Sequence, residues 1–359
     1  MSLEDRLKRV RQGLAEKEVD AIFISQPENR RYLSGFDGST GYLLITAQDA
    51  ILATDFRYLE RARRQAPGYE IFRIDGDTDD WFPKLATEVS VKKLGFETRH
   101  VTFYRYKQLS DILKRARIEL RLIPVDGLVE SLRAIKEPEE VELITQAAAI
   151  SDVTFEYAEG MIRTGMTEQE VAWEIEKFMR DKGSEAIPFD VIVGSGPNAS
   201  SPHAKPSSRT IGPGEPIVID LGAKIEGYCS DLTRTICLGT PDKTFGRVYD
   251  TVLGAQLTAM AMIREGMTGD EADSMGRIVL REAGYGEAFG HALGHGVGLA
   301  PHERPRLGPD SQDVMASGMV FTIEPGIYLA GWGGVRIEDL VVMENGRIRA
   351  ISKSRKIGA

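Results

Sequence analysis

An internal repeat in the second half of the chain restricts its possible folds more than any other feature of the sequence. The segment MIRTGMTEQE at 161–170 returns as MIREGMTGDE at 262–271, with seven of ten positions identical at an offset of 101 residues. Further on, GEPIVIDLG at 214–222 matches GMVFTIEPG at 318–326 at an offset of 104. Each half therefore reads as two helices and a strand that ends in a carboxylate. Because this period is too long for a solenoid, we expect two halves with pseudo-two-fold symmetry, an α+β arrangement with helices covering one antiparallel sheet.

The first 125 residues show a different pattern. An amphipathic stretch at 3–17 predicts a helix, and short apolar runs at 21–25, 42–46, 50–54 and 69–74 predict strands. Strands that alternate with helices favour an α/β domain.

Turn residues place the boundary between the two domains near residue 128. The segment LIPVDG at 122–127 reads as a junction, and Pro138 is placed to open a helix. A length of 359 residues also fits about two domains of roughly 150 residues each. We therefore expect an α/β domain at 1–128 and the α+β repeat domain at 129–359.

Composition excludes several classes of function. The chain has 45 Lys and Arg against 54 Asp and Glu, which gives a net charge of −9. A chain with this acidic balance lacks the excess of basic residues typical of a nucleic-acid-binding protein. The sequence contains no run of 18 apolar residues, so it predicts no membrane-spanning helix. The charged start MSLEDRLKR lacks the apolar core of a signal peptide. Two cysteines cannot form a disulfide framework, which fits a reducing compartment. We expect a cytoplasmic protein that binds neither nucleic acid nor membrane.

Each half of the repeat carries two acidic residues on either side of a glycine-containing turn. Asp220 ends an apolar strand, and Asp231 lies eleven residues later. Glu324 ends a second apolar strand, and Glu338 follows fourteen residues later. We expect two hairpins with an acid on either arm. If the halves are symmetric, the four carboxylates converge on one axis.

Four convergent carboxylates require compensation, because like charges a few ångströms apart force proton uptake. Divalent cations supply that compensation, and an imidazole is available at His295 in HALGHGVG, where alternate glycines disfavour a helix. Oxygen ligands with one imidazole suit manganese, cobalt, iron or zinc. Taken alone, each acid could be a solvated loop residue or a buried structural acid; the repeat favours a joint metal site.

These motifs resemble a known family. Asp220-x10-Asp231, His-x-x-Gly-His295-Gly-x-Gly, Glu324-Pro-Gly and Arg-Ile-Glu338-Asp resemble the dinuclear metallopeptidases of the pita-bread fold, which include aminopeptidase P, prolidase and methionine aminopeptidase, with creatinase as a non-metal relative. The resemblance covers about residues 130–359. An initial helix followed by NRRYLSGF is similar to the creatinase-type N-terminal domain of the proline-specific members, and methionine aminopeptidases lack it. Compact bacterial Xaa-Pro peptidases are the nearest likeness.

The resemblance implies a ligand set for two divalent metal ions, with manganese favoured and cobalt, zinc or iron as alternatives. In such enzymes Asp231 and Glu338 bridge the two ions, Asp220 completes one site, and His295 and Glu324 complete the other. Two ions of this kind activate water and polarise the scissile carbonyl. Glu324 is then placed to accept a proton from the water; the alternative is a ligand with no role in proton transfer.

The same resemblance implies substrate-binding or catalytic roles for further residues. Positions like His203 and His302 bind substrate and assist collapse of the tetrahedral intermediate, and His291 lines the pocket for the residue after the cleaved bond. Tyr328 resembles a tyrosine near the intermediate. Arg336 shares a strand face with Glu338, so it either binds a carboxylate or orients a ligand, or it forms a supporting ion pair.

The resemblance implies a peptidase that removes the first residue from peptides whose second residue is proline, an Xaa-Pro aminopeptidase. The alternative is an Xaa-Pro dipeptidase, or prolidase, which shares every motif. Prolidases often add an arginine for the carboxylate of the dipeptide, and Arg304 and Arg306 are open candidates. A non-catalytic pita-bread binding protein is a remote alternative, because all five ligand positions are present. Relatives are usually dimers or tetramers, so we expect a homodimer or homotetramer.

One acidic residue of the N-terminal domain is a candidate for the amino group of the substrate. Asp37 is the only acid in the loop GFDGST at 35–40. We predict that it approaches the substrate amine, directly, through water or from a neighbouring subunit. An ordinary turn aspartate beside Gly38 is the alternative.

Overall fold

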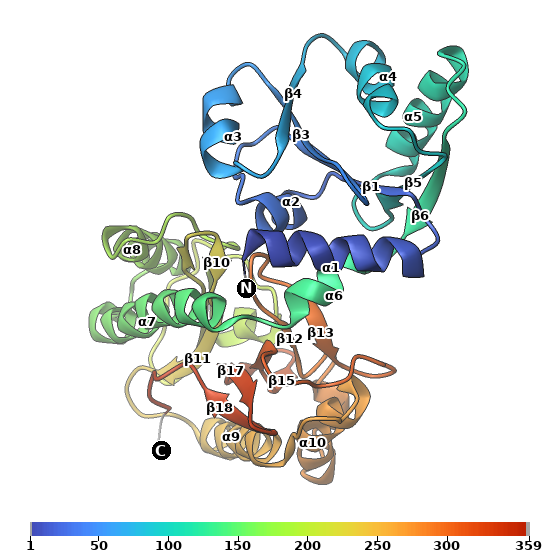
Figure 1. Ribbon diagram of the computed structural model, residues 1–359. Coiled ribbons are helices and arrows are strands. Elements are labelled where there is room, and N and C mark those ends of the chain that lie inside the picture. The colour runs from blue at the N-terminus through green and yellow to red at the C-terminus, as the bar shows by residue number, and fades with distance from the viewer. Residues whose placement is uncertain (1, 357–359) are drawn as a thin grey trace. The chain divides into compact units, whose positions relative to one another are not determined.

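The computed structural model describes residues 2–356, and its contacts divide the chain into two compact units (Figure 1). The first unit ends at Arg133 and the second begins at Ala134, shortly after the boundary expected near residue 128. Among residues 2–356, no helix combines the length and the apolar character that crossing a membrane requires.

The N-terminal unit is an α/β domain, as its alternating pattern predicts. Its six-stranded sheet has the order β4-β3-β2-β1-β5-β6. The strands are β1 (Ala21–Ile24), β2 (Tyr42–Thr46), β3 (Ala50–Asp55), β4 (Glu70–Ile74), β5 (Lys93–Glu97) and β6 (Arg121–Val125). The helices are α1 (Leu3–Glu16), α2 (Pro27–Ser34), α3 (Leu59–Gln65), α4 (Thr78–Glu88), α5 (Phe103–Arg115) and α6 (Leu128–Ala134). Strand β2 runs antiparallel to both neighbours, and the remaining pairs are parallel.

The segment 122–127, expected to be a junction between the domains, is mostly part of strand β6 in the N-terminal sheet. Pro124 stands opposite Phe96 in the parallel pair of β5 and β6. A proline has no N–H to donate to a ladder, so it is tolerated where only one side of the strand is paired. Strand β6 is such an edge strand, and its proline marks the border of the sheet rather than a linker.

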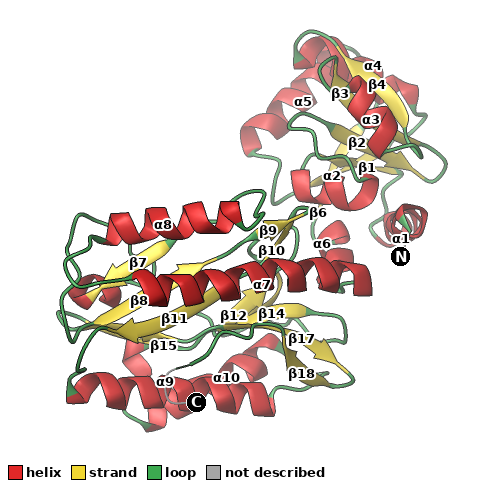
Figure 2. Cartoon of the chain, turned by 90° about the vertical axis from the view of Figure 1, so that its left-hand side faces the viewer, coloured by secondary structure: helices red, strands yellow, loops and turns green. Residues whose placement is uncertain are grey.

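The C-terminal unit contains four long helices and a set of antiparallel strands (Figure 2). The helices are α7 (Pro138–Met161), α8 (Glu168–Asp181), α9 (Lys243–Met262) and α10 (Gly269–Glu282). A three-stranded sheet has the order β11-β8-β7, with β7 (Ile192–Ser195), β8 (Pro216–Leu221) and β11 (Leu232–Cys237). A five-stranded sheet has the order β13-β12-β14-β17-β18, with β12 (Gly294–Gly296), β13 (Glu303–Leu307), β14 (Val320–Ile323), β17 (Asp339–Glu344) and β18 (Arg347–Ala350). Two short hairpins pair β9 (Lys224–Ile225) with β10 (Tyr228–Cys229) and β15 (Gly326–Leu329) with β16 (Gly333–Arg336).

The internal repeat of the sequence is present in the structure. Helices α8 and α10 begin with equivalent capping boxes, Thr167 with Glu170 and Thr268 with Glu271. Each capping threonine also forms an isolated antiparallel bridge with the segment that leads to the next strand of its half. Because both elements and contacts recur in the same order, the predicted α+β unit with an internal pseudo-two-fold repeat is confirmed.

The single antiparallel sheet expected from the repeat is divided. The second hairpin is broken after Ile323: strand β14 pairs with β17, whereas β15 pairs with β16. Pro325 lies at this break and has no N–H for a ladder, which favours an interruption there. The two halves of the unit still meet, because the Glu338 N–H donates to the Thr233 carbonyl at 3.0 Å. Glu324 and Glu338 thus lie at the point where the pairing of β14 with β17 ends and that of β15 with β16 begins.

A buried carboxylate at the start of α8 holds the loop that carries His203. Glu168 is fully buried and accepts hydrogen bonds from the backbone N–H and hydroxyl of both Ser195 and Ser207, at 2.6 to 3.0 Å. The Asn198 amide also donates to it at 3.0 Å. These contacts fix both ends of the segment 196–206.

We expect Glu168→Ala to lower the free energy of unfolding by roughly 2–5 kcal/mol, because it leaves several buried donors without an acceptor. Glu170→Ala, on the same helix, removes only an exposed capping contact and should cost about 1 kcal/mol or less. Urea denaturation of both variants measures the difference. Equal losses would show that the Glu168 network contributes no more than a helix cap.

Candidate metal centre

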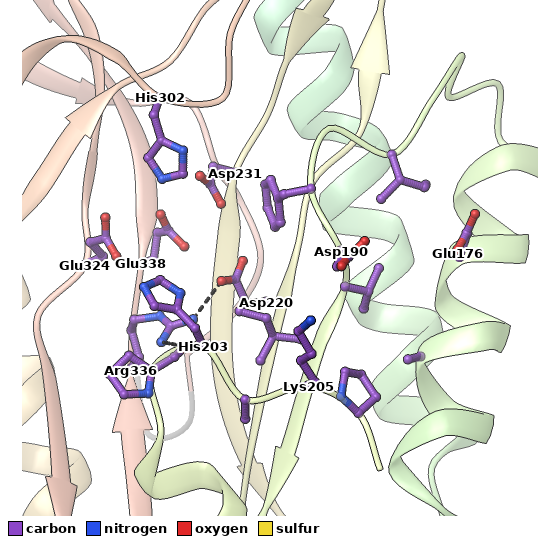
Figure 3. Close-up of a pocket in the computed structure, with 18 of the residues that line it drawn as sticks. Glu176, Asp190, His203, Lys205, Asp220, Asp231, His302, Glu324, Arg336 and Glu338 are labelled. Atoms are coloured by element: carbon purple, nitrogen blue, oxygen red, sulfur yellow. Dashed lines mark hydrogen bonds and ion pairs between the residues drawn. The ribbon is translucent and has the colours of Figure 1, made fainter.

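The five predicted ligands lie on strands or directly beside them. Asp220 is on β8, Asp231 immediately precedes β11, and His295 is the middle residue of β12. Glu324 follows β14, and Glu338 lies between β16 and β17. All five line one cavity of about 870 Å³ in the C-terminal unit, where Figure 3 shows the acids facing one another.

Three of these residues form a tight cluster. One ligand atom from each of Asp231, His295 and Glu338 lies within 4.8 Å of the others. The His295 Nε2 atom is 3.7 Å from Asp231 Oδ2 and 3.3 Å from Glu324 Oε1. On the other side of the ring, Nδ1 lies 3.1 Å from the Gly296 carbonyl. A proton on Nδ1 that donates to this carbonyl leaves Nε2 as the nitrogen that faces the acids, which is the usual arrangement of a histidine ligand.

Electrostatics in the cluster favour the presence of a cation. Burial and the neighbouring Glu338 raise the pKa of Asp231 well above its ordinary value, and burial and Glu324 raise that of Glu338. Burial opposes ionisation of Glu324 as well, but contact with His295 outweighs it and lowers the Glu324 pKa to about 2. A divalent cation among these groups stabilises all the carboxylates in their ionised form.

The donor set fits divalent metal ions. It consists of four carboxylates and one imidazole, the hard oxygen and nitrogen ligands that manganese, iron, cobalt and zinc accept. Asp220 gives a second indication: its Oδ1 atom is buried and has no hydrogen-bond partner among the described residues, while Oδ2 accepts from Arg336 at 2.7 Å. An oxygen of this kind is available as a ligand.

Arg336 connects the ligands to the wall behind them. Besides Asp220, it donates to the Thr233 hydroxyl at 3.1 Å and to the Tyr328 hydroxyl at 3.0 Å. The Thr233 hydroxyl in turn donates to Glu338 Oε2 at 2.6 Å. Arg336 therefore forms the supporting ion pair that the sequence left as one of two alternatives, and it still lines the cavity. Contact with a substrate carboxylate stays a prediction.

The predicted histidines also line the cavity. The imidazoles of His302 and His295 have ring centroids 4.1 Å apart, and burial together with His295 lowers the His302 pKa to about 4. His203 belongs to the loop fixed by Glu168 and lines the same wall as Asp220 (Figure 3). His291 donates through Nδ1 to the Ala292 carbonyl at 2.8 Å and accepts a hydrogen bond from the Tyr328 hydroxyl on Nε2 at 2.9 Å. Tyr328 thus lies behind the cavity wall.

The remaining candidates have other partners. Asp37 lies in the N-terminal unit, where its carboxylate pairs with Arg61 at 2.7 Å. In the C-terminal unit, Arg304 pairs with Asp313, and Arg306 donates to the Pro309 carbonyl at 2.7 Å. Neither arginine is among the residues that line the cavity.

The cavity extends beyond the predicted residues, toward helix α8. Its lining there includes Trp173 and Glu176 of that helix. Asp190 and Lys205 also line the cavity (Figure 3). Trp173 is 63% exposed, unusual for so large an apolar side chain. An isolated tryptophan on a helix carries no sequence signal for a cavity. Lys205 could have been singled out, since it lies two residues after His203.

Comparison with known proteins gives consistent matches along the whole chain. Residues 142–345 match Metallopeptidase family M24, and residues 6–135 match the Creatinase/Prolidase N-terminal domain. The chain is 36% identical to an Xaa-Pro dipeptidase of Pyrococcus horikoshii, with 99% of each protein covered. Among solved structures, an Xaa-Pro dipeptidase from Bacillus anthracis is similar at 42% identity and a TM-score of 0.94, with 99% of each chain covered. The X-Pro aminopeptidase from Thermotoga maritima is similar at 36% identity and a TM-score of 0.85, covering 96% of this chain and 98% of that one.

Proposed function

This chain belongs to metallopeptidase family M24, and we propose that it hydrolyses Xaa-Pro dipeptides at the bond that precedes proline. The membership confirms the resemblance to the pita-bread metallopeptidases, so the chain is a metal-dependent peptidase. The observation that carries the proposal is the convergence of four carboxylates and His295 in one cavity. Relatives named Xaa-Pro dipeptidase or prolidase support the dipeptide as substrate.

We assign the five ligand positions to two divalent ions. Asp231 and Glu338 would be shared by the two ions, Asp220 would complete one site, and His295 and Glu324 would complete the other. Manganese is the favoured ion, with cobalt, zinc and iron as alternatives. When bound, such ions supply Lewis-acid polarisation of the scissile carbonyl and activation of the attacking water.

Side chains around the proposed ligands would supply proton transfer, substrate binding and positioning of the ligands. Glu324 accepts the proton of the attacking water, since its carboxylate borders both the cavity and His295. His302 and His203 donate hydrogen bonds to the substrate and to the charge that develops on its carbonyl oxygen. Arg336 holds Asp220 in place, and His291 lines the pocket for the proline side of the bond.

Removal of the first residue from longer Xaa-Pro peptides, the activity expected first from the sequence, is a second candidate. The cavity supports it, because its lining continues past the acid cluster to Trp173 and Glu176 of helix α8. A relative named X-Pro aminopeptidase supports it too.

Paired hydrolysis assays separate the two candidates. The enzyme with added Mn²⁺ is offered an Xaa-Pro dipeptide, the same dipeptide extended by one residue, and an Xaa-Ala dipeptide as a control. Dipeptidase activity requires cleavage of the first substrate with little cleavage of the second, and aminopeptidase activity requires cleavage of the second. Cleavage of neither proline peptide would contradict both proposals and favour the non-catalytic binding protein.

Asp37 stays a predicted contact of the substrate amine. We expect Asp37→Ala to weaken kcat/KM for tripeptides by about 1–3 kcal/mol, the cost of leaving a cationic group without its partner. Because Asp37 pairs with Arg61, the control is Arg61→Met, which removes the pair but keeps the acid. Unchanged kinetics in a folded Asp37→Ala variant, or an equal loss in the control, would leave Asp37 a turn residue.

Two further predictions concern the whole protein. A homodimer or homotetramer follows from the family, and sedimentation equilibrium measures the assembly. A cytoplasmic location follows from the cysteine content and the family resemblance. Fractionation of the producing cell tests the location.

A further inference from the structure

A single buried arginine joins the two halves of the C-terminal unit behind the candidate metal centre. Arg234, on β11, is 1% exposed. Its guanidinium has five N–H groups, and all five have acceptors. Four acceptors are backbone carbonyls, and the fifth is the carboxylate of Asp339 at 2.7 Å. So complete a set of partners indicates a fixed position for this side chain.

One terminal nitrogen of Arg234 links strands of opposite halves. It donates to the Thr233 carbonyl at 3.0 Å and also to the Glu338 carbonyl. The Glu338 N–H reaches the same Thr233 carbonyl. Asp231 lies two residues before Thr233, and Glu338 is the other candidate bridging ligand. The nitrogen therefore joins the backbone next to Asp231 to the backbone of Glu338, the two candidate bridging ligands.

The other donors of Arg234 bind the segment 351–356, which follows strand β18. Its Nε and second terminal nitrogen donate to the carbonyls of Arg355 and Ser354, at 3.1 and 2.7 Å. The Lys356 ammonium closes the network by donating to Asp339 at 2.6 Å. From helix α7, Asp152 accepts hydrogen bonds from the Ser354 N–H and hydroxyl, at 2.8 and 2.7 Å. The segment is thus held from both sides.

We propose that Arg234 and the segment 351–356 are positioning elements that fix Glu338 relative to Asp231 and thereby set the affinity of the centre for metal ions. The inference rests on the proposed metal site. Neither Arg234 nor Lys356 lines the cavity. Arg234 acts through the backbone carbonyls of Thr233 and Glu338, and Lys356 acts through the carboxylate of Asp339, the residue after Glu338. Loss of partners in an outer layer of a metal site typically weakens metal affinity by about 10–100-fold.

The test compares Mn²⁺ binding by two variants and two matched controls. Arg234→Lys keeps a charge for Asp339 but loses the nitrogen that bridges the halves, and Lys356→Met removes the second cation from Asp339. Arg355→Lys and Lys353→Met change exposed neighbours in the same segment, where Arg355 pairs with Glu159 and Lys353 contributes only its backbone N–H to Asp152. Isothermal titration of metal-stripped protein gives affinity and stoichiometry, and electron paramagnetic resonance reports the coupling between two bound Mn²⁺ ions.

We expect Arg234→Lys to bind Mn²⁺ about 10–100-fold more weakly and to lose the coupled signal, with a smaller change in the same direction for Lys356→Met. Both controls should match the wild type. A merely structural role would lower the melting temperature while leaving affinity and signal unchanged at a temperature where circular dichroism shows folded protein, and that result overturns the inference. If Arg234→Lys does not fold, Lys356→Met against Lys353→Met decides. A wild-type protein that binds no Mn²⁺ would instead overturn the proposed function.

Discussion

Replacement of Asp231 by asparagine is expected to remove the bound metal ions and to abolish peptide hydrolysis. The change removes one of the two carboxylates assigned as bridges, while size and shape stay nearly the same. Loss of Lewis-acid catalysis removes several kcal/mol of transition-state stabilisation, or roughly 10³–10⁵-fold in rate. Elemental analysis of the purified variant and its activity toward an Xaa-Pro peptide measure the two effects together.

Asp190→Asn is the matched control for this variant. Asp190 lines the same cavity but lies outside the cluster of Asp231, His295 and Glu338. It loses the same charge, so a general electrostatic effect of the cavity would appear in both variants. Two retained metal ions and retained activity in Asp231→Asn would contradict the ligand assignment.

A His302→Ala variant is expected to keep its metal and lose roughly 10²–10⁴-fold in kcat, the usual contribution of a positioned acid–base group. Burial and the adjacent His295 lower the His302 pKa to about 4, so its imidazole is neutral near pH 7 and can donate one hydrogen bond to a substrate oxygen. Alanine removes this donor and leaves the five ligands unchanged.

The control for the second variant is His100→Ala, which changes a histidine of the N-terminal unit that does not line the cavity. Its kinetics should match those of the wild type. Loss of metal from His302→Ala would place His302 among the ligands and contradict the division between binding and chemistry.

Much of the centre could be predicted because its signals are local. Asp220 lies next to the end of β8 and Glu324 directly after β14, at equivalent points of the repeat, and the glycines around His295 disfavour a helix. The repeat then relates segments more than 100 residues apart without any knowledge of their contacts. The strands at 21–24 and 42–46 follow from their apolar runs in the same way.

The features that sequence reasoning missed depend on contacts between distant segments. Pro124 reads as a breaker until β6 is known to be an edge strand. The break between β14 and β15 depends on which strand each one pairs with, and a local pattern does not contain that information. Arg234 looks like an ordinary charged residue on a strand, since its partners lie up to 121 residues away.

The origin of the ligands in both halves of the repeat has a consequence for how the protein matures. Two of the five proposed ligands come from residues before 240 and three from residues after 290, so a nascent chain carries no complete set until Glu338 has been synthesised. Contacts of such long sequence separation form late in folding, because their loop-closure entropy must be overcome first. A metal ion that binds only the finished arrangement stabilises the native state by about 2.7 kcal/mol at a concentration one hundred times its Kd. We therefore expect metal supply to stabilise the completed fold as well as to enable its activity, and peptide hydrolysis to begin only after the strand next to Glu338 has docked.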